Sequence, residues 1–430
     1  MYAKTTLENG IRVVTEKISG TRSIAIGVMV DTGLRDEPEN KQGIAHMAEH
    51  LMFQGTSSRS SQEIARIMDE AGGQMGGFTS RDYTLYTATV LDDYRTYALD
   101  LLGNILLNSL FLEADLEREK ETITREIAAT FDYPNQRTDA MLKAHVWQDH
   151  YLGRCIAGTP ESVQSITRED LIYYVHSRYL PDRIIIAAAG NLEHDEFVSQ
   201  VRDAFWRLMG TSPTLEGSRP PHRPGIARED RDVSQLYFAL GLEACPYAHP
   251  ARYALHVFNK ALGDGISSRL YRRIRDEVGM VYHIDSEYHA YRDAGMLVIE
   301  GSTSLELFGQ VLERTVAELQ GIMTGADPIT DEEVWKAKMQ VRAQHLIASE
   351  NTHTRMGRLA TQEFYFDESI STEAILEDID GIEADMLRHF SQHLLINACH
   401  NPAIAVIGPD AEALCSSADT AALLNIFCSN

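Results

Sequence analysis

Cysteine is scarce in this sequence, and the few cysteines form no recognisable pattern. The 430 residues include five cysteines, and no two have the Cys-x-x-Cys spacing; they are Cys155, Cys245, Cys399, Cys415 and Cys428. An odd, scattered set argues against a disulfide framework, because a framework needs paired cysteines. Such usage is typical of a reducing compartment, and we expect a cytoplasmic protein.

Long apolar runs are also missing. No stretch of about 18 consecutive apolar residues occurs, which predicts that no helix of the chain spans a membrane. The first residues, MYAKTTLENGIRVV, lack the apolar core of a secretory signal. We therefore expect the mature domain to begin at once.

Basic residues are outnumbered by acidic ones. Lys and Arg total 39 against 63 Asp and Glu, which gives a formal charge of −24. A chain this acidic repels nucleic acid and anionic membranes, so we expect neither as a partner. The apolar fraction of 44 % and the charged fraction of 24 % are those of a globular protein and exclude general disorder. The length predicts two domains, or three.

The strand and helix signals predict an α+β fold. Ser23–Val30 alternates apolar residues with the period of a half-buried strand, and Arg183–Ala189 is a continuous apolar run typical of a buried one. Helical spacing recurs over residues 64–71, and Thr330 with Glu333 predicts a capping box that opens a long helix. We expect α/β sandwich domains, each with an antiparallel-rich sheet covered by helices.

A proline-rich segment divides the chain into two halves. Residues 211–228, TSPTLEGSRPPHRPGIAR, have little apolar periodicity, which predicts a linker between domains 1–210 and 229–430. The halves look related: the helix opening near Ser165 resembles one near Gly381, and the turn at Gly190 resembles one at Gly408. Both matches have an offset of about 217 residues, which favours an ancient duplication over chance.

One short segment has the spacing of a metal site. In GIAHMAEHLMFQGT, His46 and His50 are four residues apart, so on a helix they project from one face with Glu49 beside them. Two such imidazoles can bind zinc, and a catalytic zinc site also needs a third ligand and a proton-accepting carboxylate. The alternative is a surface helix with two ordinary histidines, which is our interpretation of the similarly spaced His389 and His393.

A second segment supplies carboxylates. Residues 112–130, LEADLEREKETITREIAAT, predict a helix on which Glu119 and Glu126 lie two turns apart on one face. One of them could complete the metal shell while the other orients a ligand. The alternative is a solvated acidic helix face.

Together these segments resemble the inverted zinc motif of the pitrilysin/insulinase metallopeptidase family, and the resemblance spans essentially the whole chain. In that family the third ligand is a glutamate some 76 residues past the second histidine, and Glu126 stands at that distance from His50. The resemblance implies Zn²⁺ as the cofactor. It also implies that His46, His50 and Glu126 bind the ion, that Glu49 is the general base, and that Glu119 is the supporting glutamate.

The second half contains a further match. The segment GDGISSRLYRRIRDEVGMVY resembles the family's glycine-rich loop, SSRL helix and Arg–Tyr pair, which fall on Arg275 and Tyr282. A guanidinium and a phenol can bind a substrate carbonyl or a developing oxyanion. The resemblance implies that the two halves close on each other like a clamshell.

The peptide substrate is expected to pair with a sheet edge in residues 72–86. Relatives usually have Asn-Ala where this chain has Gly76 and Gly77, and loss of the Asn side chain removes a substrate hydrogen bond. Phe78 on the same edge is a further predicted substrate contact. Phe53 matches a position that lines the pocket just after the scissile bond.

Chain length indicates the subgroup. Family members of this length, such as the mitochondrial processing peptidase subunits and bacterial relatives, pair to enclose a chamber. This chain carries both residue sets, so we expect a homodimer, with a heterodimer as the alternative. In the mitochondrial enzyme, two acidic residues recognise a basic residue that precedes the cleavage site of the substrate. The corresponding residues here are Gln136 and Ala140, which argues against strict arginine specificity.

The sequence therefore predicts a zinc-dependent endopeptidase that hydrolyses unfolded peptides or short polypeptides. Two alternatives stay open. One is a peptide-maturation protease that needs a partner subunit. The other is a non-catalytic assembly subunit, like the family-related core proteins of the respiratory bc1 complex. The presence of all four residues of the zinc motif favours an enzyme over an assembly subunit.

Overall fold

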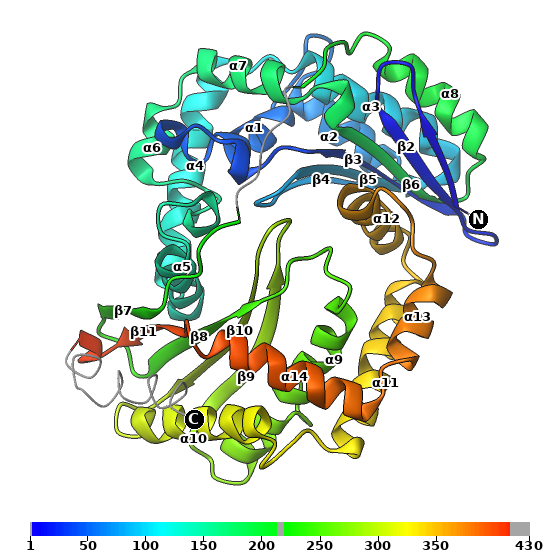
Figure 1. Cartoon of the computed structure of the whole chain (residues 1–430). Coiled ribbons are helices and arrows are strands. Elements are labelled where there is room, and N and C mark those ends of the chain that lie inside the picture. The colour runs from blue at the N-terminus through cyan, green and yellow to red at the C-terminus, as the bar shows by residue number, and fades with distance from the viewer. Residues whose placement is uncertain (1, 213–218, 413–430) are drawn as a thin grey trace. The chain divides into compact units, whose positions relative to one another are not determined.

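The chain forms two compact units, each assembled from segments that are distant in sequence. The computed structural model describes residues 2–212 and 219–412, so Cys415 and Cys428 lie outside the described residues (Figure 1). Within the described ranges, unit 1 comprises residues 2–129, 154–212 and 346–370. Unit 2 comprises residues 130–153, 219–345 and 371–412.

Unit 1 is centred on a six-stranded sheet with the order β1-β2-β6-β3-β5-β4. Its strands are β1 (Tyr2–Thr6), β2 (Arg12–Lys17), β3 (Ser23–Val30), β4 (Gln74–Thr79), β5 (Thr84–Leu91) and β6 (Ile184–Gly190). The pair β2–β6 is parallel and the other pairs are antiparallel. The edge strand β4 lies within the predicted substrate-binding edge.

Helices cover both faces of this sheet. Those of unit 1 are α1 (Ile44–Met52), α2 (Ser61–Glu70), α3 (Arg95–Asn108), α4 (Glu113–Asp132, whose last residues belong to unit 2), α6 (Pro160–Ser165), α7 (Arg168–Arg178), α8 (His194–Phe205) and α12 (Thr352–Phe366). Helices α1, α3, α7 and α8 build the larger core on one face. Helix α12 packs on β2, β3 and β6 from the other face (Figure 1).

The prediction that Ser23–Val30 is half-buried was wrong. The strand is there, as β3, but seven of its eight residues are buried. Ala25 and Met29, on the face opposite the alternating isoleucines and valines, pack with Met356 of α12. Because α12 lies more than 300 residues later in the sequence, local periodicity could not reveal this second cover.

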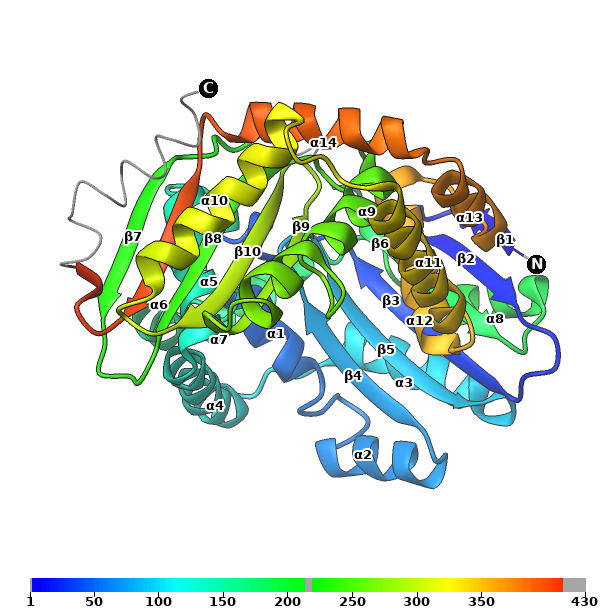
Figure 2. The ribbon, with the colours of Figure 1, turned by 90° about the horizontal axis from the view of Figure 1, so that it is seen from below.

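Unit 2 has a five-stranded sheet with the order β7-β11-β8-β10-β9. Its strands are β7 (Gly225–Asp230), β8 (Leu236–Ala244), β9 (Val281–Ala290), β10 (Gly295–Thr303) and β11 (Ala403–Gly408). Its helices are α5 (Pro134–Val146), α9 (Arg252–Leu262), α10 (Phe308–Thr324), α11 (Asp331–Ala348), α13 (Thr372–Asp380) and α14 (Ala384–Ala398). Helix α5 covers β7, β8 and β11, and α14 contacts β8, α9 and α10 (Figure 2).

The predicted capping box of α11 is present. The Thr330 N–H donates to Glu333 Oε2 at 2.9 Å, and the Glu333 N–H donates to Thr330 Oγ1 at 3.2 Å. Glu333 also binds the buried guanidinium of Arg269, at 2.6 Å from Nη2 to Oε2. The cap therefore anchors the segment that leads to Arg275.

The two sheets repeat one topology, which confirms the relation between the halves. Strands β2 to β6 and β7 to β11 have the same order and the same single parallel pair, β2–β6 and β7–β11. Gly190 and Gly408 end equivalent strands with φ of 142° and 159°. A Cβ at either position would lie within 3 Å of the neighbouring strand, 2.7 Å from Ile24 Cα and 2.9 Å from Leu236 Cα. Both positions therefore require glycine.

The halves exchange one helix each. Helices α5 and α12 are equivalent in this repeat, since each is the third helix after the strand pairs β4–β5 and β9–β10. Each packs on the sheet of the unit formed mainly by the other half. The predicted domains 1–210 and 229–430 are the two halves of the sequence, and they stay a prediction. Each compact unit of the structure combines segments from both halves. Residues 225–228 of the predicted linker begin β7, an edge strand entered directly after Pro224.

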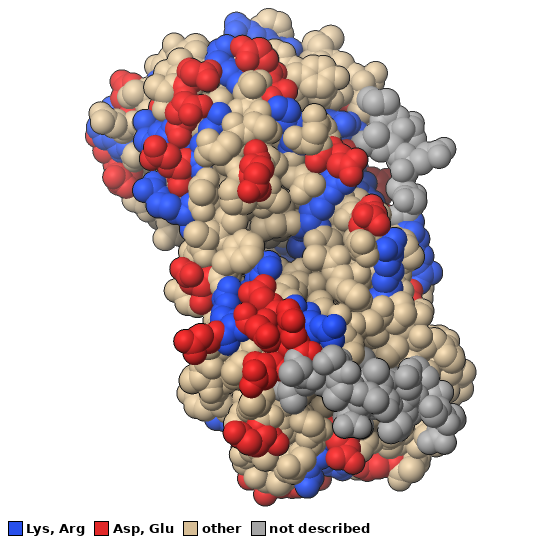
Figure 3. Space-filling model, turned by 90° about the vertical axis from the view of Figure 1, so that its left-hand side faces the viewer, with Lys and Arg blue, Asp and Glu red and all other residues tan. Residues whose placement is uncertain are grey.

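Charges of both signs are mixed on one face of the molecule (Figure 3). On the face drawn in Figure 3, basic side chains lie among the acidic ones, so the net charge of −24 does not produce one acidic field there. Among the described residues, no helix combines the length and the apolar character needed to cross a membrane.

Candidate active site

Helix α1 carries the predicted HxxEH motif, and its N-terminus is held by a buried carboxylate. Glu37 accepts hydrogen bonds from the backbone N–H groups of Gly43 and Ala45, both at 2.9 Å. These are among the N–H groups that the first turn of a helix leaves unpaired, so the carboxylate acts as a cap. Burial raises the pKa of Glu37 to about 8, and the two N–H groups oppose that rise. This contact fixes where the helix starts.

The three predicted ligands converge in unit 1. The donor atoms of His46, His50 and Glu126 all lie within 4.8 Å of one another. Glu126 Oε2 is 3.9 Å from His46 Nε2 and 3.8 Å from His50 Nε2. Tetrahedral zinc ligands at about 2.0–2.1 Å from the ion are separated by about 3.3 Å, so a small side-chain movement would fit the ion.

The protonation of His46 suits metal binding. Burial, and to a lesser degree the neighbouring His50, lowers the pKa of His46 to about 4. The imidazole is therefore neutral at physiological pH, which is the form that ligates metals. These residues fit a zinc ion.

Glu119 supports the second histidine. Its Oε2 lies 3.1 Å from His50 Nδ1, and its Oε1 accepts a hydrogen bond from Gln54 Nε2 at 3.1 Å. Because a carboxylate can only accept, we assign the proton to Nδ1, which leaves the Nε2 lone pair of His50 facing the other donors.

Replacing Glu119 with Ala tests this support. We expect the zinc affinity to fall about 10- to 100-fold, because the variant no longer fixes the tautomer and orientation of His50. Competition with a chromophoric chelator measures the affinity. Glu121→Ala, an exposed position on the same helix, is the control. An unchanged affinity in Glu119→Ala would show that His50 is oriented by other contacts.

Glu49 is buried beside the ligands, with 8 % of its surface exposed. Thr79 Oγ1 donates to its Oε2 at 3.1 Å. Burial raises the pKa of Glu49, and Glu126 adds to the rise while His50 and Thr79 oppose it. A Cβ built on Gly77 would lie 2.7 Å from Glu49 Cγ and 2.8 Å from Cδ. The absence of a side chain at Gly77 therefore leaves room for this carboxyl group.

The other predicted substrate contacts in unit 1 lie at the end of α1 and on β4. Phe53 caps the C-terminus of α1, with its ring centroid 6.0 Å from that of Tyr86. Phe78 is 55 % exposed. A Cβ built on Gly76 has nothing within 4 Å, so this position is open. An exposed phenyl ring and an open backbone on an edge strand suit the binding of an extended chain.

Arg275 and Tyr282 both belong to unit 2. Arg275 lies in a π-helical turn, Tyr271–Asp276, where its guanidinium donates to Tyr271 Oη and lies 4.5 Å from the centre of that ring. Tyr282 is 74 % exposed and lies where the register of β9 against β10 shifts between Thr303 and Ser302. Both irregularities are of the kind that recurs at functional sites.

Sequence reasoning missed three supporting residues. Gln54 lies in the recognised motif segment, and Thr79 lies within the recognised sheet edge, residues 72–86, so both could have been considered. Glu37 is joined to α1 by a segment that contains the short 3-10 helix Glu39–Lys41, and no periodic spacing connects the two.

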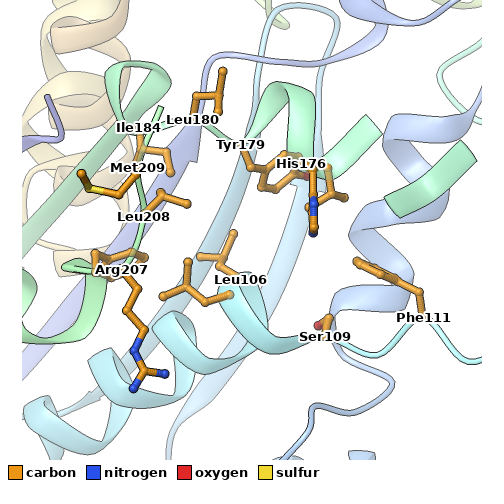
Figure 4. Close-up of a pocket in the computed structure, with 13 residues that line it drawn as sticks. Leu106, Ser109, Phe111, His176, Tyr179, Leu180, Ile184, Arg207, Leu208 and Met209 are labelled. Atoms are coloured by element: carbon orange, nitrogen blue, oxygen red, sulfur yellow. The ribbon is translucent and has the colours of Figure 1, made fainter. Parts of the chain in front are cut away.

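An apolar cavity in unit 1 contains none of the predicted residues. It has a volume of about 290 Å³, and its lining combines the apolar side chains of Leu106, Phe111 and Leu208 with His176 and Arg207 (Figure 4). The predicted metal ligands of unit 1 lie elsewhere, on α1 and α4.

Family models match most of the chain. Residues 12–160 match the model described as insulinase, peptidase family M16, and residues 165–341 match the model described as the peptidase M16 inactive domain. The chain belongs to the M16 insulinase family. This confirms the predicted family.

Individual M16 relatives agree. A Bacillus subtilis protein called uncharacterized zinc protease YmxG is 32 % identical, over 95 % of this chain and 98 % of its own. An uncharacterized zinc protease of Mycobacterium tuberculosis is 34 % identical, over 94 % and 93 % of the two chains.

Solved structures show the same fold. A peptidase M16 inactive domain from Pseudomonas fluorescens has a TM-score of 0.88 at 18 % identity, over 95 % of this chain and 98 % of that one. A chain of complex III from Candida albicans has a TM-score of 0.85 at 18 % identity, over 98 % and 99 %. These two likenesses concern the fold alone.

Proposed function

We propose that this M16 chain is a zinc-dependent endopeptidase that hydrolyses unfolded peptides or short polypeptides. The observation that carries the proposal is the convergence of His46, His50 and Glu126, with the buried Glu49 beside them. Zinc as the cofactor agrees with the family and with relatives that are named zinc proteases. A zinc ion in this site would polarise a substrate carbonyl and lower the pKa of water to about 7.

Glu49 is the general base in this proposal. Its Oε2 accepts a hydrogen bond from Thr79 Oγ1, which leaves Oε1 free for proton transfer. Oε1 takes a proton from the attacking water and then gives it to the leaving amine. The raised pKa of Glu49 makes its carboxylate a stronger proton acceptor than an exposed glutamate. Glu119 contributes indirectly by holding His50.

The substrate binds as an extended strand along the free edge of β4. Backbone hydrogen bonds give affinity, and Phe53 and Phe78 contact side chains. Arg275 and Tyr282 bind a substrate carbonyl or stabilise the oxyanion.

Gly76→Asn tests the substrate edge. The open space around Gly76 accommodates a side chain, and an added hydrogen bond is worth about 0.5–1.5 kcal/mol. We expect kcat/KM for peptides to rise about twofold to tenfold. Gly309→Asn, at an exposed glycine of α10 that also has no neighbour within 4 Å and no positive φ, is the control for surface substitution. A fall in kcat/KM would contradict alignment along β4.

The proposed assembly is a cytoplasmic homodimer, and the native mass of the purified protein tests it. A monomer that becomes active only with an added chain would support the partner-dependent alternative. The likeness to complex III concerns the fold alone, and the four intact residues of the zinc motif favour an enzyme over an assembly subunit.

Metal removal tests the activity itself. Unstructured peptides of varied sequence are incubated with the metal-depleted protein and with the same protein after saturation with Zn²⁺, and products are identified by mass spectrometry. We expect cleavage only after zinc is restored. Cleavage by the metal-depleted chain would overturn the proposal. So would a lack of cleavage by both the metal-depleted and the zinc-restored protein, once the protein is confirmed to be a homodimer.

A further inference from the structure

A second group of metal-ligating side chains lies on the sheet of unit 2. The donor atoms of His283, Asp285 and Glu300 lie within 4.8 Å of one another. His283 Nε2 is 3.4 Å from Asp285 Oδ2. No other cluster of three such donors occurs in residues 2–212 and 219–412 apart from the one in unit 1.

The backbone holds these side chains together. His283 and Asp285 are two residues apart on β9, so they project from one face of the sheet. Asp285 is directly opposite Glu300 on β10 in the antiparallel register. The arrangement therefore depends on two paired strands and not on a loop.

The negative charge of the cluster is compensated only in part, by Lys143 of α5. Asp285 Oδ1 is buried without a hydrogen-bond partner among the described residues. Further negative charge nearby comes from the carboxylates of Asp139, Glu287 and Asp264. Lys143 Nζ donates to Asp139 Oδ2 at 2.5 Å. Such a site gains stability from a bound cation.

We propose that His283, Asp285 and Glu300 bind a second divalent transition-metal ion. One imidazole nitrogen and two carboxylate oxygens form a donor set suited to Zn²⁺ or Mn²⁺. A lysine or arginine side chain would use the carboxylates but has no need of the imidazole lone pair.

Access to the ion is provided by a pocket. His283 and Glu300 line a cavity of about 520 Å³ together with Tyr282, Tyr237 and Tyr133. Three protein ligands leave coordination positions that open into this cavity, where water or a ligand oxygen completes the shell. The ion would lie next to the tyrosine that the proposed peptidase uses for substrate, but its binding does not depend on that activity.

Equilibrium dialysis of the full chain against Zn²⁺, with the protein-bound metal quantified by mass spectrometry, tests the proposal. We expect two bound ions for the wild type and one for His283→Asn/Glu300→Gln. The ion at His46 and His50 reports that unit 1 of the variant is folded, and the thermal unfolding transition of unit 2 reports the same for the altered unit. A His389→Asn/His393→Asn variant, which removes an exposed histidine pair from α14, is the matched control and should retain both ions.

Three results would overturn the proposal. They are one ion in the wild type, two ions in the His283/Glu300 variant, and loss of the second ion in the α14 control. The single variant Glu300→Gln provides a milder test and should weaken the second zinc affinity at least tenfold. Peptides that contain lysine or arginine are added at a saturating zinc concentration. If they prevent the second zinc ion from binding, the pocket binds basic side chains of peptides and the metal assignment is wrong.

Discussion

Replacing Glu49 with Gln is expected to lower kcat for peptide hydrolysis by about 10²- to 10⁴-fold, the range that a positioned general base contributes. The amide keeps the size of the carboxyl group and can still accept from Thr79, so α1 and β4 stay in place. It cannot take a proton from water. Zinc affinity should therefore change little, because none of the three ligands is altered. Initial rates on one cleaved peptide, with zinc content measured on the same samples, separate the two quantities.

The matched control is Glu121→Gln, which removes one negative charge from α4 at an exposed position. Its kcat should equal that of the wild type. If Glu49→Gln keeps full activity, Glu49 is not the base. If it loses zinc as well as activity, Glu49 has a ligand or structural role.

Replacing His50 with Asn should abolish zinc binding at the unit 1 site. Zinc at about 1,000 times its Kd stabilises the binding state by about 4.1 kcal/mol, which corresponds to a rise of about 8–16 °C in Tm for a unit of this size. The wild type should show this rise in the unfolding transition of unit 1, and His50→Asn should show none. Differential scanning calorimetry with and without zinc measures it.

The histidine pair of α14 again provides the control. His389 and His393 have the same i, i+4 spacing as His46 and His50, and their ring centroids are 4.3 Å apart compared with 4.5 Å. His393→Asn should keep the zinc-induced shift, because no third donor completes that pair among the described residues. An undiminished shift in His50→Asn would place the stabilising ion elsewhere.

The sequence was most informative where chemistry and local periodicity coincide. His46 and His50 are one helical turn apart, so their spacing alone predicted a shared face. The 76-residue separation of His50 and Glu126 is meaningful only through family resemblance, because nothing local indicates that α4 lies beside α1. The structure places these residues together, and their roles stay proposals until variants are measured.

Contacts between distant segments could not be read from the sequence. The second cover of β3 comes from Met356, and the cap of α1 comes from the loop residue Glu37. The segment at residue 225 looked like a linker because prolines precede it, but its partner β11 is more than 170 residues away. In each case the contact that determines the structure involves residues too far apart in the sequence, or too irregularly spaced, to form a recognisable local pattern.

The exchange of α5 and α12 has a consequence for biosynthesis. The sheet of unit 1 is complete when β6 ends at Gly190, but the helix that covers its second face ends at Phe366. At roughly 5–20 residues per second, a ribosome needs about 9–35 s to make the intervening 176 residues. Throughout that interval Ala25, Met29 and Ile185, which are buried in the finished protein, have no cover from their own chain. The nascent polypeptide therefore passes through a stage with an exposed apolar sheet face, which is prone to aggregation until α12 has been made.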